Sequence, residues 1–491
     1  MRISIEEIKE YAKDYSCVPL TEELPMNYTP VGIVKKIRTE YSHCFMLESR
    51  EDPGRMGRYT FIGFDPEAEI TCKNFHIRIS DENGAREIDG NPEKYIGEML
   101  KRYRAPKLEG LPPFSGGLVG YFGYDYVKYS EKTLDLDAED DGNFKDVDLM
   151  LFNKLIAFDN FEEKMIIIVN IMTDNPEKNY YEGIEEIKRI KKFIDTAPVA
   201  EPEPLKLKTG FTPLFDGAGY GAMVEKAKRY IREGDIFQVV LSNRLEAEAE
   251  GSLFRAYEIL RHINPSPYMF WFSSDDIEIA GASPETLVKL ENKTLFTYPL
   301  AGTRPRGKTA AEDDALEKEL LDDEKELAEH NMLVDLGRND LGKISKFGSV
   351  RVESFHNILK FSHVMHIGST VTGTIRDDRS ALDALNSVLP AGTLSGAPKI
   401  RAMQIINELE NNKRGIYGGA IGYIDFTGNL DTCISIRLAY KKKGKVYVRS
   451  GAGIVADSDP EKEHRECINK AMAVVKAVEQ SAGEDEDGFT D

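Results

Sequence analysis

Cysteine is scarce in this sequence of 491 residues, tryptophan occurs once, and long apolar runs are missing. The five cysteines are odd in number and scattered, without a CxxC pair or a spacing typical of metal ligands. They are Cys17, Cys44, Cys72, Cys433 and Cys467. Because such cysteines do not make a disulfide framework, we expect reduced thiols in a cytoplasmic protein.

The N-terminal segment lacks the apolar core of a signal peptide. It reads MRISIEEIKEYAKDYS, a pattern of helical periodicity with interspersed charges. No later stretch offers the roughly 20 apolar residues of a transmembrane helix. Neither secretion nor membrane insertion is therefore expected.

Positive charge is in deficit. The chain carries 64 Lys and Arg against 84 Asp and Glu, a formal net charge of -20. This charge opposes non-specific binding to nucleic acid or anionic lipid, so neither is an expected partner. An anionic substrate would need a bound cation or a local cluster of Arg and Lys.

Signals for covalent catalysis are missing as well. No cysteine lies in a Cys-His nucleophile context, and no GxSxG elbow occurs. Histidine is sparse, with eight residues, and FSHVMHIG places His363 and His366 three residues apart. A histidine among apolar neighbours is more often structural than catalytic, so this segment alone decides nothing.

The pattern along the chain predicts an α/β (α+β) protein with a layered β core surrounded by helices. Strand-like runs at 60–64, 76–79 and 165–170 alternate with charged helical stretches. We expect longer helices at 176–195, 220–235, 311–340 and 463–480. The proline-rich APVAEPEPLKLK favours an extended connector, which places a domain boundary between about 195 and 212. The prediction is an N-terminal domain at 1–200, a catalytic domain at 212–480 and a disordered acidic tail at 481–491.

Two predicted helices carry ExxE pairs: Glu326 with Glu329, and Glu463 with Glu466. A spacing of three places both carboxylates of a pair on one helix face. If the two faces meet, their oxygens suit a hard cation such as Mg2+, and Lys470 lies one turn beyond Glu466. The alternative is two solvated acidic faces.

Three segments rich in small residues precede helices: PLAGTRPRG at 299–307, LPAGTLSGAPKIRAM at 389–403 and RSGAGIVADSDP at 449–460. Small residues let backbone N–H groups approach an anion such as a carboxylate. The last segment fits an ordinary strand-to-helix turn equally well.

Taken in order, these segments resemble the chorismate-utilising enzyme family. The motifs are PLAGTRPRG, DEKELAEHNMLVDLGRNDLGKIS, FSHVMH, LPAGTLSGAPKIRAM, RGIYGGAIGYI, CISIRLAY and GAGIVADSDPEKEHRECINKA. Each motif is weak alone, but the ordered set spans most of residues 216 to 478. CFMLESRE, at 44–51, is similar to the amino-terminal domain of the anthranilate synthase component I branch. The resemblance implies the fold of that branch.

The resemblance also implies site residues. Glu329 and Glu466 correspond to the Mg2+ ligands, with Glu326 and Glu463 as water-mediated partners. The implied chorismate contacts are Gly302, Thr303, Tyr417, Arg437, Gly451, Ala452, Gly453 and Lys470. The implied catalytic residues are Glu285, which protonates the leaving hydroxyl, His366, which transfers a proton, and Thr393 beside them.

The reaction implied is that of a Mg2+-dependent lyase of tryptophan biosynthesis. Ammonia adds to the ring of chorismate, the ring hydroxyl leaves, and elimination of pyruvate gives the aromatic amine. Relatives that use water carry a lysine where this chain has Gln238, and relatives that make the para isomer carry a lysine where it has Ala301. Gln238 therefore favours ammonia as the nucleophile, and Ala301 argues against aminodeoxychorismate synthase component I. The intact Glu285, Glu329, His366 and Glu466 argue against a non-catalytic binding subunit.

A third discriminator is regulatory. Ser49, Pro267, Tyr268 and Met269 resemble a feedback site for L-tryptophan, although packing between domains would also explain them. No glutaminase constellation is present, so the family implies a separate glutamine amidotransferase, component II, that supplies ammonia. The complex expected from the family is a heterotetramer of two large and two small subunits.

Overall fold

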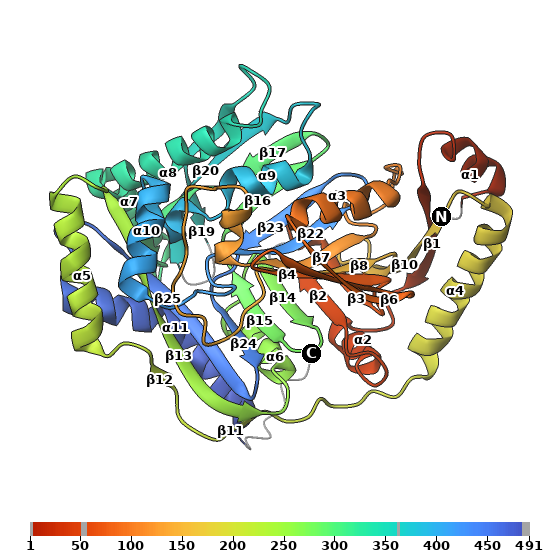
Figure 1. Ribbon diagram of the computed structural model, residues 1–491, viewed down its shortest axis with the longest axis horizontal. Coiled ribbons are helices and arrows are strands. Elements are labelled where there is room, and N and C mark those ends of the chain that lie inside the picture. The colour runs from red at the N-terminus through yellow and green to blue at the C-terminus, as the bar shows by residue number, and fades with distance from the viewer. Residues whose placement is uncertain (1–2, 51–55, 361–363, 484–491) are drawn as a thin grey trace.

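The computed structural model describes residues 3–50, 56–360 and 364–483, and within them two antiparallel sheets form the centre of the molecule (Figure 1). The first sheet has the order β1-β10-β9-β3-β2-β14-β15-β24-β25-β13-β11. Its strands are β1 (Cys17–Pro25), β10 (Lys164–Met172), β9 (Lys154–Asp159), β3 (Tyr59–Phe64), β2 (Cys44–Glu48), β14 (Tyr268–Ser273), β15 (Glu278–Ser283), β24 (Leu438–Lys442), β25 (Lys445–Ile454), β13 (Gln238–Glu250) and β11 (Lys206–Leu207), with β12 (Thr212–Pro213) and β21 (Gly396–Ala397) paired to β13.

The second sheet has the order β18-β20-β17-β16-β23-β22-β7-β8-β4-β5-β6. Its strands are β18 (Leu300–Pro305), β20 (Val364–Thr374), β17 (Thr294–Thr297), β16 (Thr286–Glu291), β23 (Leu430–Ile434), β22 (Ala420–Asp425), β7 (Gly117–Phe122), β8 (Val147–Phe152), β4 (Ala68–Lys73), β5 (His76–Asp81) and β6 (Gly84–Asp89), with β19 (Arg351–Lys360) paired to β20.

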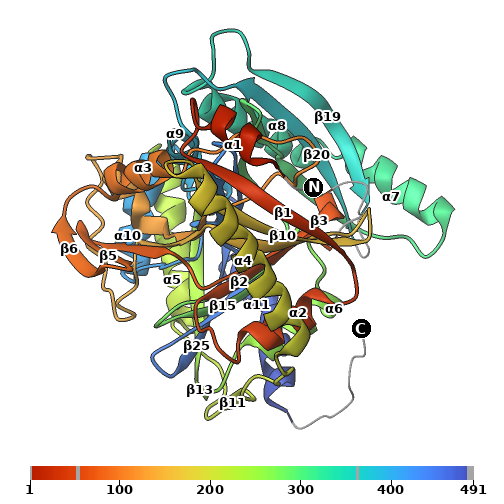
Figure 2. The same cartoon turned by 90° about the vertical axis from the view of Figure 1, so that its right-hand side faces the viewer.

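Helices cover the outer faces of the two sheets (Figures 1 and 2). They are α1 (Ile5–Tyr11), α2 (Pro30–Ile37), α3 (Pro92–Arg102), α4 (Pro176–Thr196), α5 (Gly217–Arg232), α6 (Phe254–Ile263), α7 (Ala310–Asp322), α8 (Glu324–Gly342), α9 (Ala381–Val388), α10 (Lys399–Glu410) and α11 (Pro460–Ala482), with short 3-10 turns η1 (Met56–Arg58), η2 (Tyr124–Tyr129) and η3 (Gly392–Leu394). Figure 2 shows α4 lying across β1 and β10. None of the helices in the described ranges has the length and apolarity needed to cross a membrane.

The core has three main parts. Aromatic residues of both sheets meet between them, including Phe45, Phe152 and Phe270. A second cluster joins the outer face of the first sheet to α2, α4, α6 and α11, and a third joins the second sheet to α3, α8 and α9. This arrangement of helices around a layered β core confirms the predicted fold class.

Strands from both sides of the predicted domain boundary share each sheet. In the first sheet β2 pairs with β14, and in the second β7 pairs with β22. The proline-rich connector follows α4 directly and includes the short strand β11 near its end. The division into domains at 1–200 and 212–480 stays a prediction about folding units. Residues 484–491, most of the predicted tail, lie outside the described residues, and α11 continues to Ala482.

One helix expected from the sequence is two helices. The run at 311–340 is divided at Asp323, whose backbone is extended at ψ 101°. The Asp323 carboxylate accepts hydrogen bonds from the N–H groups of Lys325 and Glu326, so it caps α8. Its other oxygen accepts from Arg304 at 2.9 Å, which fixes the cap to β18.

Candidate active site

Glu285 and Thr393 form the first pair of predicted catalytic residues. Glu285 follows β15 in the turn to β16, and Thr393 lies in η3. The Thr393 hydroxyl donates a hydrogen bond to Glu285 Oε1 at 3.1 Å. Burial raises the pKa of Glu285 to about 7, against the opposing effects of that hydrogen bond and of the charges of Arg437 and Lys470. A carboxyl group of this pKa can hold a proton at neutral pH and release it during a reaction.

His366 lies on β20, opposite Thr303 of β18. Its Nδ1 is 2.9 Å from the carbonyl oxygen of Gly302 and 3.1 Å from Thr303 Oγ1. The carbonyl can only accept, so this geometry assigns the proton to Nδ1 and leaves Nε2 as the basic nitrogen. Burial lowers the pKa of His366, the hydrogen bond to Gly302 opposes this, and the charge of Arg437 adds to it. The lowered pKa favours the neutral imidazole, which can accept a proton.

Gly302 has a backbone conformation that orients this carbonyl. The register of β18 shifts between Ala301 and Thr303, and Gly302 adopts a φ of +65°. A Cβ at this position would lie 2.9 Å from Leu320 Cδ1 and 3.3 Å from Glu326 Oε2. Both the conformation and the space favour glycine.

The predicted chorismate-binding segment Gly451–Gly453 lies within β25 rather than in a turn. A Cβ on Gly451 would approach the Tyr417 hydroxyl to 2.8 Å, and one on Gly453 would approach Gln238 Nε2 to 2.8 Å. The Lys470 ammonium donates to the carbonyl oxygen of Gly451 at 3.3 Å. The structure therefore brings Tyr417, Gln238 and Lys470 to one short stretch of strand.

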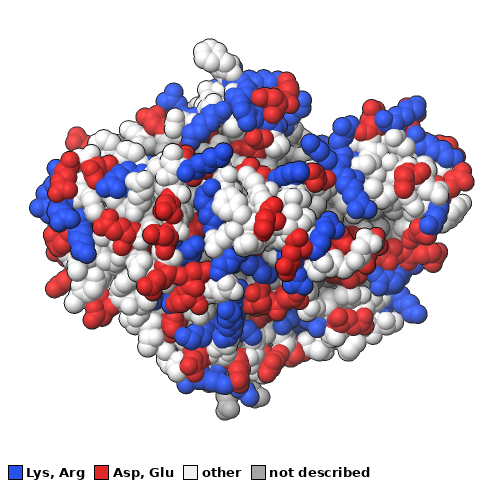
Figure 3. All heavy atoms as spheres, viewed as in Figure 1, with Lys and Arg blue, Asp and Glu red and all other residues white. Residues whose placement is uncertain are grey.

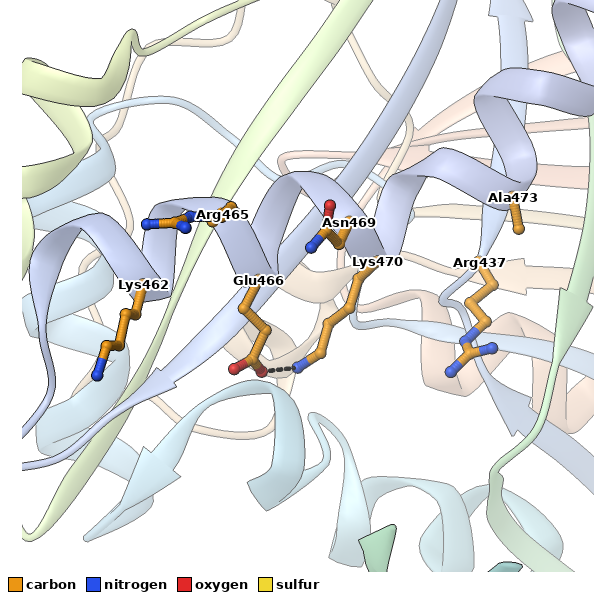
Figure 4. Close-up of a pocket in the computed structure, with 7 residues that line it drawn as sticks. All are labelled: Arg437, Lys462, Arg465, Glu466, Asn469, Lys470 and Ala473. Carbon is orange, nitrogen blue, oxygen red and sulfur yellow. Dashed lines mark ion pairs between the residues drawn. The ribbon is translucent and has the colours of Figure 1, made fainter. Parts of the chain in front are cut away.

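A pocket of about 470 Å³ lies along α11 (Figure 4). Its lining is Arg437, Lys462, Arg465, Glu466, Asn469, Lys470 and Ala473. In Figure 4 the side chains of Glu466 and Lys470 point to the same side of the helix, and their charged groups are 2.7 Å apart. Cationic groups outnumber carboxylates in this lining, whereas over the face in Figure 3 acidic and basic side chains are interspersed. A local excess of cations is what an anionic substrate of an acidic protein requires.

The pocket does not include every predicted site residue. Glu285, His366, Thr303 and Tyr417 are not part of its lining. Arg437 connects the two groups, because it lines the pocket and its charge affects the pKa values of both Glu285 and His366.

The carboxylates predicted to hold Mg2+ lie on α8 and α11. Burial raises the pKa of Glu329, and the negative charges of Glu326 and Glu466 raise it further. Burial likewise raises the pKa of Glu463, with a contribution from Glu466. Mutual repulsion among hard oxygen ligands is relieved by a divalent cation, so this donor set fits Mg2+. Within the described ranges, however, no three of these carboxylates have oxygens within 4.8 Å of one another.

The histidines beside these glutamates point elsewhere. His330 is fully buried, and its Nε2 lies 2.7 Å from the Ser369 hydroxyl. Burial lowers the pKa of His330 to about 4. The ring of His464 packs against Tyr220 of α5, with ring centroids 5.4 Å apart. Neither contributes to the carboxylate group, and His363 lies outside the described residues.

The predicted regulatory residues lie on or directly beside the neighbouring strands β2 and β14. Glu48, the last residue of β2, pairs with Met269 of β14, and the Arg50 N–H donates to the carbonyl oxygen of Ser266 at 3.1 Å. Ser49 lies between these two contacts and so next to Pro267–Met269. The Tyr268 hydroxyl contacts Thr286 Oγ1 and Asp431 Oδ1, each at 2.9 Å.

Arg414 is a positioning residue that the sequence reasoning missed. Its buried guanidinium pairs with Glu410 and donates to the carbonyl oxygens of Val240 at 2.8 Å and Leu394 at 2.6 Å. It therefore fixes β13 and the residue after Thr393 relative to each other. The sequence feature that could have identified Arg414 is its position at the start of the RGIYGG motif.

One pattern in the sequence proves coincidental. Residues 302–309, GTRPRGKT, fit the GxxxxGK[ST] spacing of a phosphate-binding loop. In the structure the first part of this segment is β18, and Arg304 and Arg306 pair with Glu319 and Asp313. Thr309 caps α7. These contacts do not form a loop of converging N–H groups.

Known proteins resemble the chain over nearly its full length. Residues 42–476 match the family described as chorismate binding enzyme. Anthranilate synthase component 1 of Acetivibrio thermocellus is 47% identical, covering 98% of this chain and 99% of that protein, and the Aquifex aeolicus protein of that name is 43% identical, covering 98% of each. The crystal structure of anthranilate synthase component I from Streptococcus pneumoniae TIGR4 is 38% identical, with a TM-score of 0.75, and covers 85% of this chain and 92% of that one.

A more distant structure shares the fold. The menaquinone-specific isochorismate synthase MenF of Escherichia coli aligns with a TM-score of 0.68 at 18% identity, covering 96% of this chain and 98% of that one. From its relatives and its fold, the chain belongs to the anthranilate synthase component 1 family of chorismate-binding enzymes.

Proposed function

We propose that this chain is the large subunit of an anthranilate synthase, which converts chorismate and ammonia to anthranilate, pyruvate and water in tryptophan biosynthesis. The observation that carries the proposal is Glu285, with a pKa raised to about 7, hydrogen-bonded to Thr393 and within the electrostatic influence of Arg437 and Lys470. A dianionic substrate needs such cations, and its departing hydroxyl needs such an acid.

The amination half of the reaction uses Glu285. Ammonia forms a C–N bond to the ring while the C–O bond to the ring hydroxyl breaks. Glu285 gives its proton to that oxygen, which leaves as water. The Thr393 hydroxyl hydrogen-bonds to the carboxylate that remains, which stabilises it in a buried setting.

The elimination half uses His366. The ring carbon that bears the new amine loses a proton, the C–O bond to the enolpyruvyl group breaks, and the released group takes up a proton to give pyruvate. With its proton on Nδ1, His366 presents Nε2 as the acceptor for the first of these steps. The carbonyl oxygen of Gly302 keeps the imidazole of His366 in this tautomer.

Two cationic side chains and one glycine-containing segment are assigned to substrate binding. Arg437 and Lys470 attract the carboxylates of chorismate, and Gly451–Gly453 let its ring approach the backbone of β25 closely. Glu329 and Glu466 would hold Mg2+, which when bound supplies positive charge to the ring carboxylate.

The proposal includes two further molecules. L-tryptophan would bind beside Ser49, Pro267, Tyr268 and Met269 as a feedback inhibitor. A glutamine amidotransferase, component II, would supply ammonia, and the family suggests a heterotetramer in the cytoplasm. The five buried free cysteines are compatible with that compartment.

Product identification tests the proposal. The purified chain is incubated with chorismate, Mg2+ and excess ammonium salt at mildly alkaline pH, with and without tryptophan. We expect anthranilate and pyruvate in equal amounts, suppressed by tryptophan. A para-aminated product would assign the chain to the aminodeoxychorismate branch, and isochorismate would assign it to the water-using branch. Lack of turnover would indicate a subunit that only binds. Glutamine should replace ammonium only after component II is added.

A further inference from the structure

A second group of metal-ligating side chains lies where the turn between β14 and β15 meets β4, outside the residues assigned to catalysis. His43 immediately precedes β2, Glu69 lies on β4, and Asp275 lies in the β14–β15 turn. One ligand atom from each lies within 4.8 Å of the other two. Glu69 lies on the second sheet, His43 and Asp275 adjoin strands of the first, and Asp275 is more than 200 residues from the other two in sequence.

The spacing of these atoms matches a first-row transition metal. His43 Nε2 and Asp275 Oδ1 are 3.2 Å apart. Two ligands of a tetrahedral ion at about 2.0–2.1 Å from the metal are about 3.3 Å apart. The pair thus already has the separation that a shared ion would impose, and a small movement of Glu69 would complete three ligands.

The second ring nitrogen of His43 is oriented as in metal-bound histidines. Its Nδ1 lies 3.0 Å from the hydroxyl of Ser42. A hydrogen bond to the nitrogen that faces away from the metal fixes the ring and its tautomer. Here that contact leaves Nε2 directed at Asp275.

Carboxylates outnumber ammonium groups around the three ligands. Asp148 and Asp276 lie beside Glu69 and Asp275, so four carboxylates face two ammonium groups, those of Lys145 and Lys442. If all four carboxylates are ionised, they carry two more charges than the two ammonium groups offset. A divalent ion would offset them.

Asp148 is a second and independent indication. It is fully buried, and its Oδ1 has no hydrogen-bond partner, although Oδ2 accepts from Ser274 and Lys145. Glu69 Oε1 is likewise buried without a hydrogen-bond partner. Buried acceptors without donors are costly, and a nearby cation would relieve that cost.

We propose that His43, Glu69 and Asp275 bind one divalent transition-metal ion of the Zn2+ class, separate from the Mg2+ of the active site. One imidazole and two carboxylates suit such an ion, whereas Mg2+ prefers oxygen ligands alone. Asp275 is exposed, so the ion can enter from solvent and keep a water ligand. The bound ion joins the turn that follows β14 to β4 and so connects the two sheets.

Zn2+ binding to the full chain tests this site. Chelator-treated protein is titrated with Zn2+ by calorimetry in excess Mg2+, and the thermal midpoint is followed in parallel. Because Zn2+ can also displace Mg2+, the titration is repeated on Glu466→Gln. The site variants are His43→Gln and Asp275→Asn, and the matched control is Asp89→Asn, which alters the exposed His76–Asp89 pair on β5 and β6.

We expect one Zn2+ per chain in the Glu466→Gln background, with a raised thermal midpoint. Each site variant should weaken this binding about tenfold or more, and Asp89→Asn should leave it unchanged. Equal Zn2+ binding in all variants would overturn the proposal, as would saturation of the unsubstituted chain only at millimolar Zn2+. In the second case a proton shared by Glu69 and Asp148 would balance the charge instead, and the thermal midpoint would depend on pH but not on Zn2+.

Discussion

The hydroxyl of Thr393 donates to the carboxylate of Glu285 at 3.1 Å, although 108 residues separate them. The hydrogen bond favours the ionised carboxylate, while burial favours the protonated acid. The balance raises the pKa of Glu285 to about 7. Each side of this balance can be changed by one substitution.

Thr393→Val removes the hydrogen bond and should raise the pKa of Glu285 further. A hydrogen bond that favours the ionised carboxylate by about 1 kcal/mol lowers its pKa by roughly 0.7 of a pH unit. If Glu285 acts as an acid, the alkaline limb of the pH profile of kcat/KM moves upward by that amount. Thr370→Val, the same change on β20 four residues from His366, should not move it. An alkaline limb that stays in place or moves downward would refute the acid role.

Glu285→Gln should abolish turnover and stabilise the protein at alkaline pH. Between pH 4.5, the ordinary pKa, and about 7, the folded state holds a proton that the unfolded state has lost. The free energy of unfolding therefore falls as pH rises through this window, and below it the effect is absent. Glutamine does not titrate, so the variant should gain about 2–3 kcal/mol relative to the parent between pH 5 and pH 8. Urea unfolding at both pH values measures this, and a pH-independent difference would contradict it.

Glu466→Gln should abolish Mg2+-dependent turnover and leave the fold intact. Its ion pair with Lys470 is exposed, and such pairs contribute little to stability. Titration of the anthranilate rate with Mg2+ is compared with the thermal midpoint. Glu461→Gln, also exposed on α11, is the control and should retain the parent Mg2+ dependence. Full Mg2+-dependent activity in Glu466→Gln would remove this residue from the metal site.

The periodic helices and their ends were readable from the sequence. For α11, predicted at 463–480, the structure gives Pro460–Ala482, with Asp459 accepting from the Lys462 N–H as its cap. The break at Asp323 was not readable, because this aspartate lies within an uninterrupted run of helix-forming residues. The role of Asp323 at the start of α8 depends on its contact with Arg304, which lies on β18.

The arrangement of the site depends on pairings that local patterns do not contain. Thr303 faces His366 because β18 and β20 pair with a register shift at Gly302. His330, adjacent to Glu329 in sequence, points into the core at Ser369 because of the helix rotation. Non-local strand pairing places Thr303 beside His366, and the rotation of α8 directs His330 into the core. A single sequence shows neither the pairing nor the rotation.

Ser49→Ala should spare turnover and weaken inhibition by tryptophan. Ser49 lies beside Tyr268 and Met269 through the pairing of β2 with β14, and it is not among the residues assigned to catalysis. Loss of one hydrogen bond of about 0.5–1.5 kcal/mol raises the inhibitory concentration of tryptophan roughly 2–13-fold. Inhibition curves measure this, and the KM for chorismate in the same variant is the internal control. Unchanged inhibition would mean that Ser49 serves only the packing between β2 and β14.

Gln238→Lys should divert part of the reaction from ammonia to water. Gln238 begins β13, and its amide nitrogen lies beside Gly453 in the segment assigned to chorismate. An amide cannot take a proton from water, whereas a lysine of lowered pKa can, so the variant should form a hydroxylated isochorismate-type product. The ammonium-dependent rate should fall about tenfold or more, since the side chain changes both length and charge. Gln238→Met keeps the length without adding a base, and it should lose rate without forming the hydroxylated product. If Gln238→Lys still gives anthranilate alone at the parent rate, the amide at position 238 does not select the nucleophile.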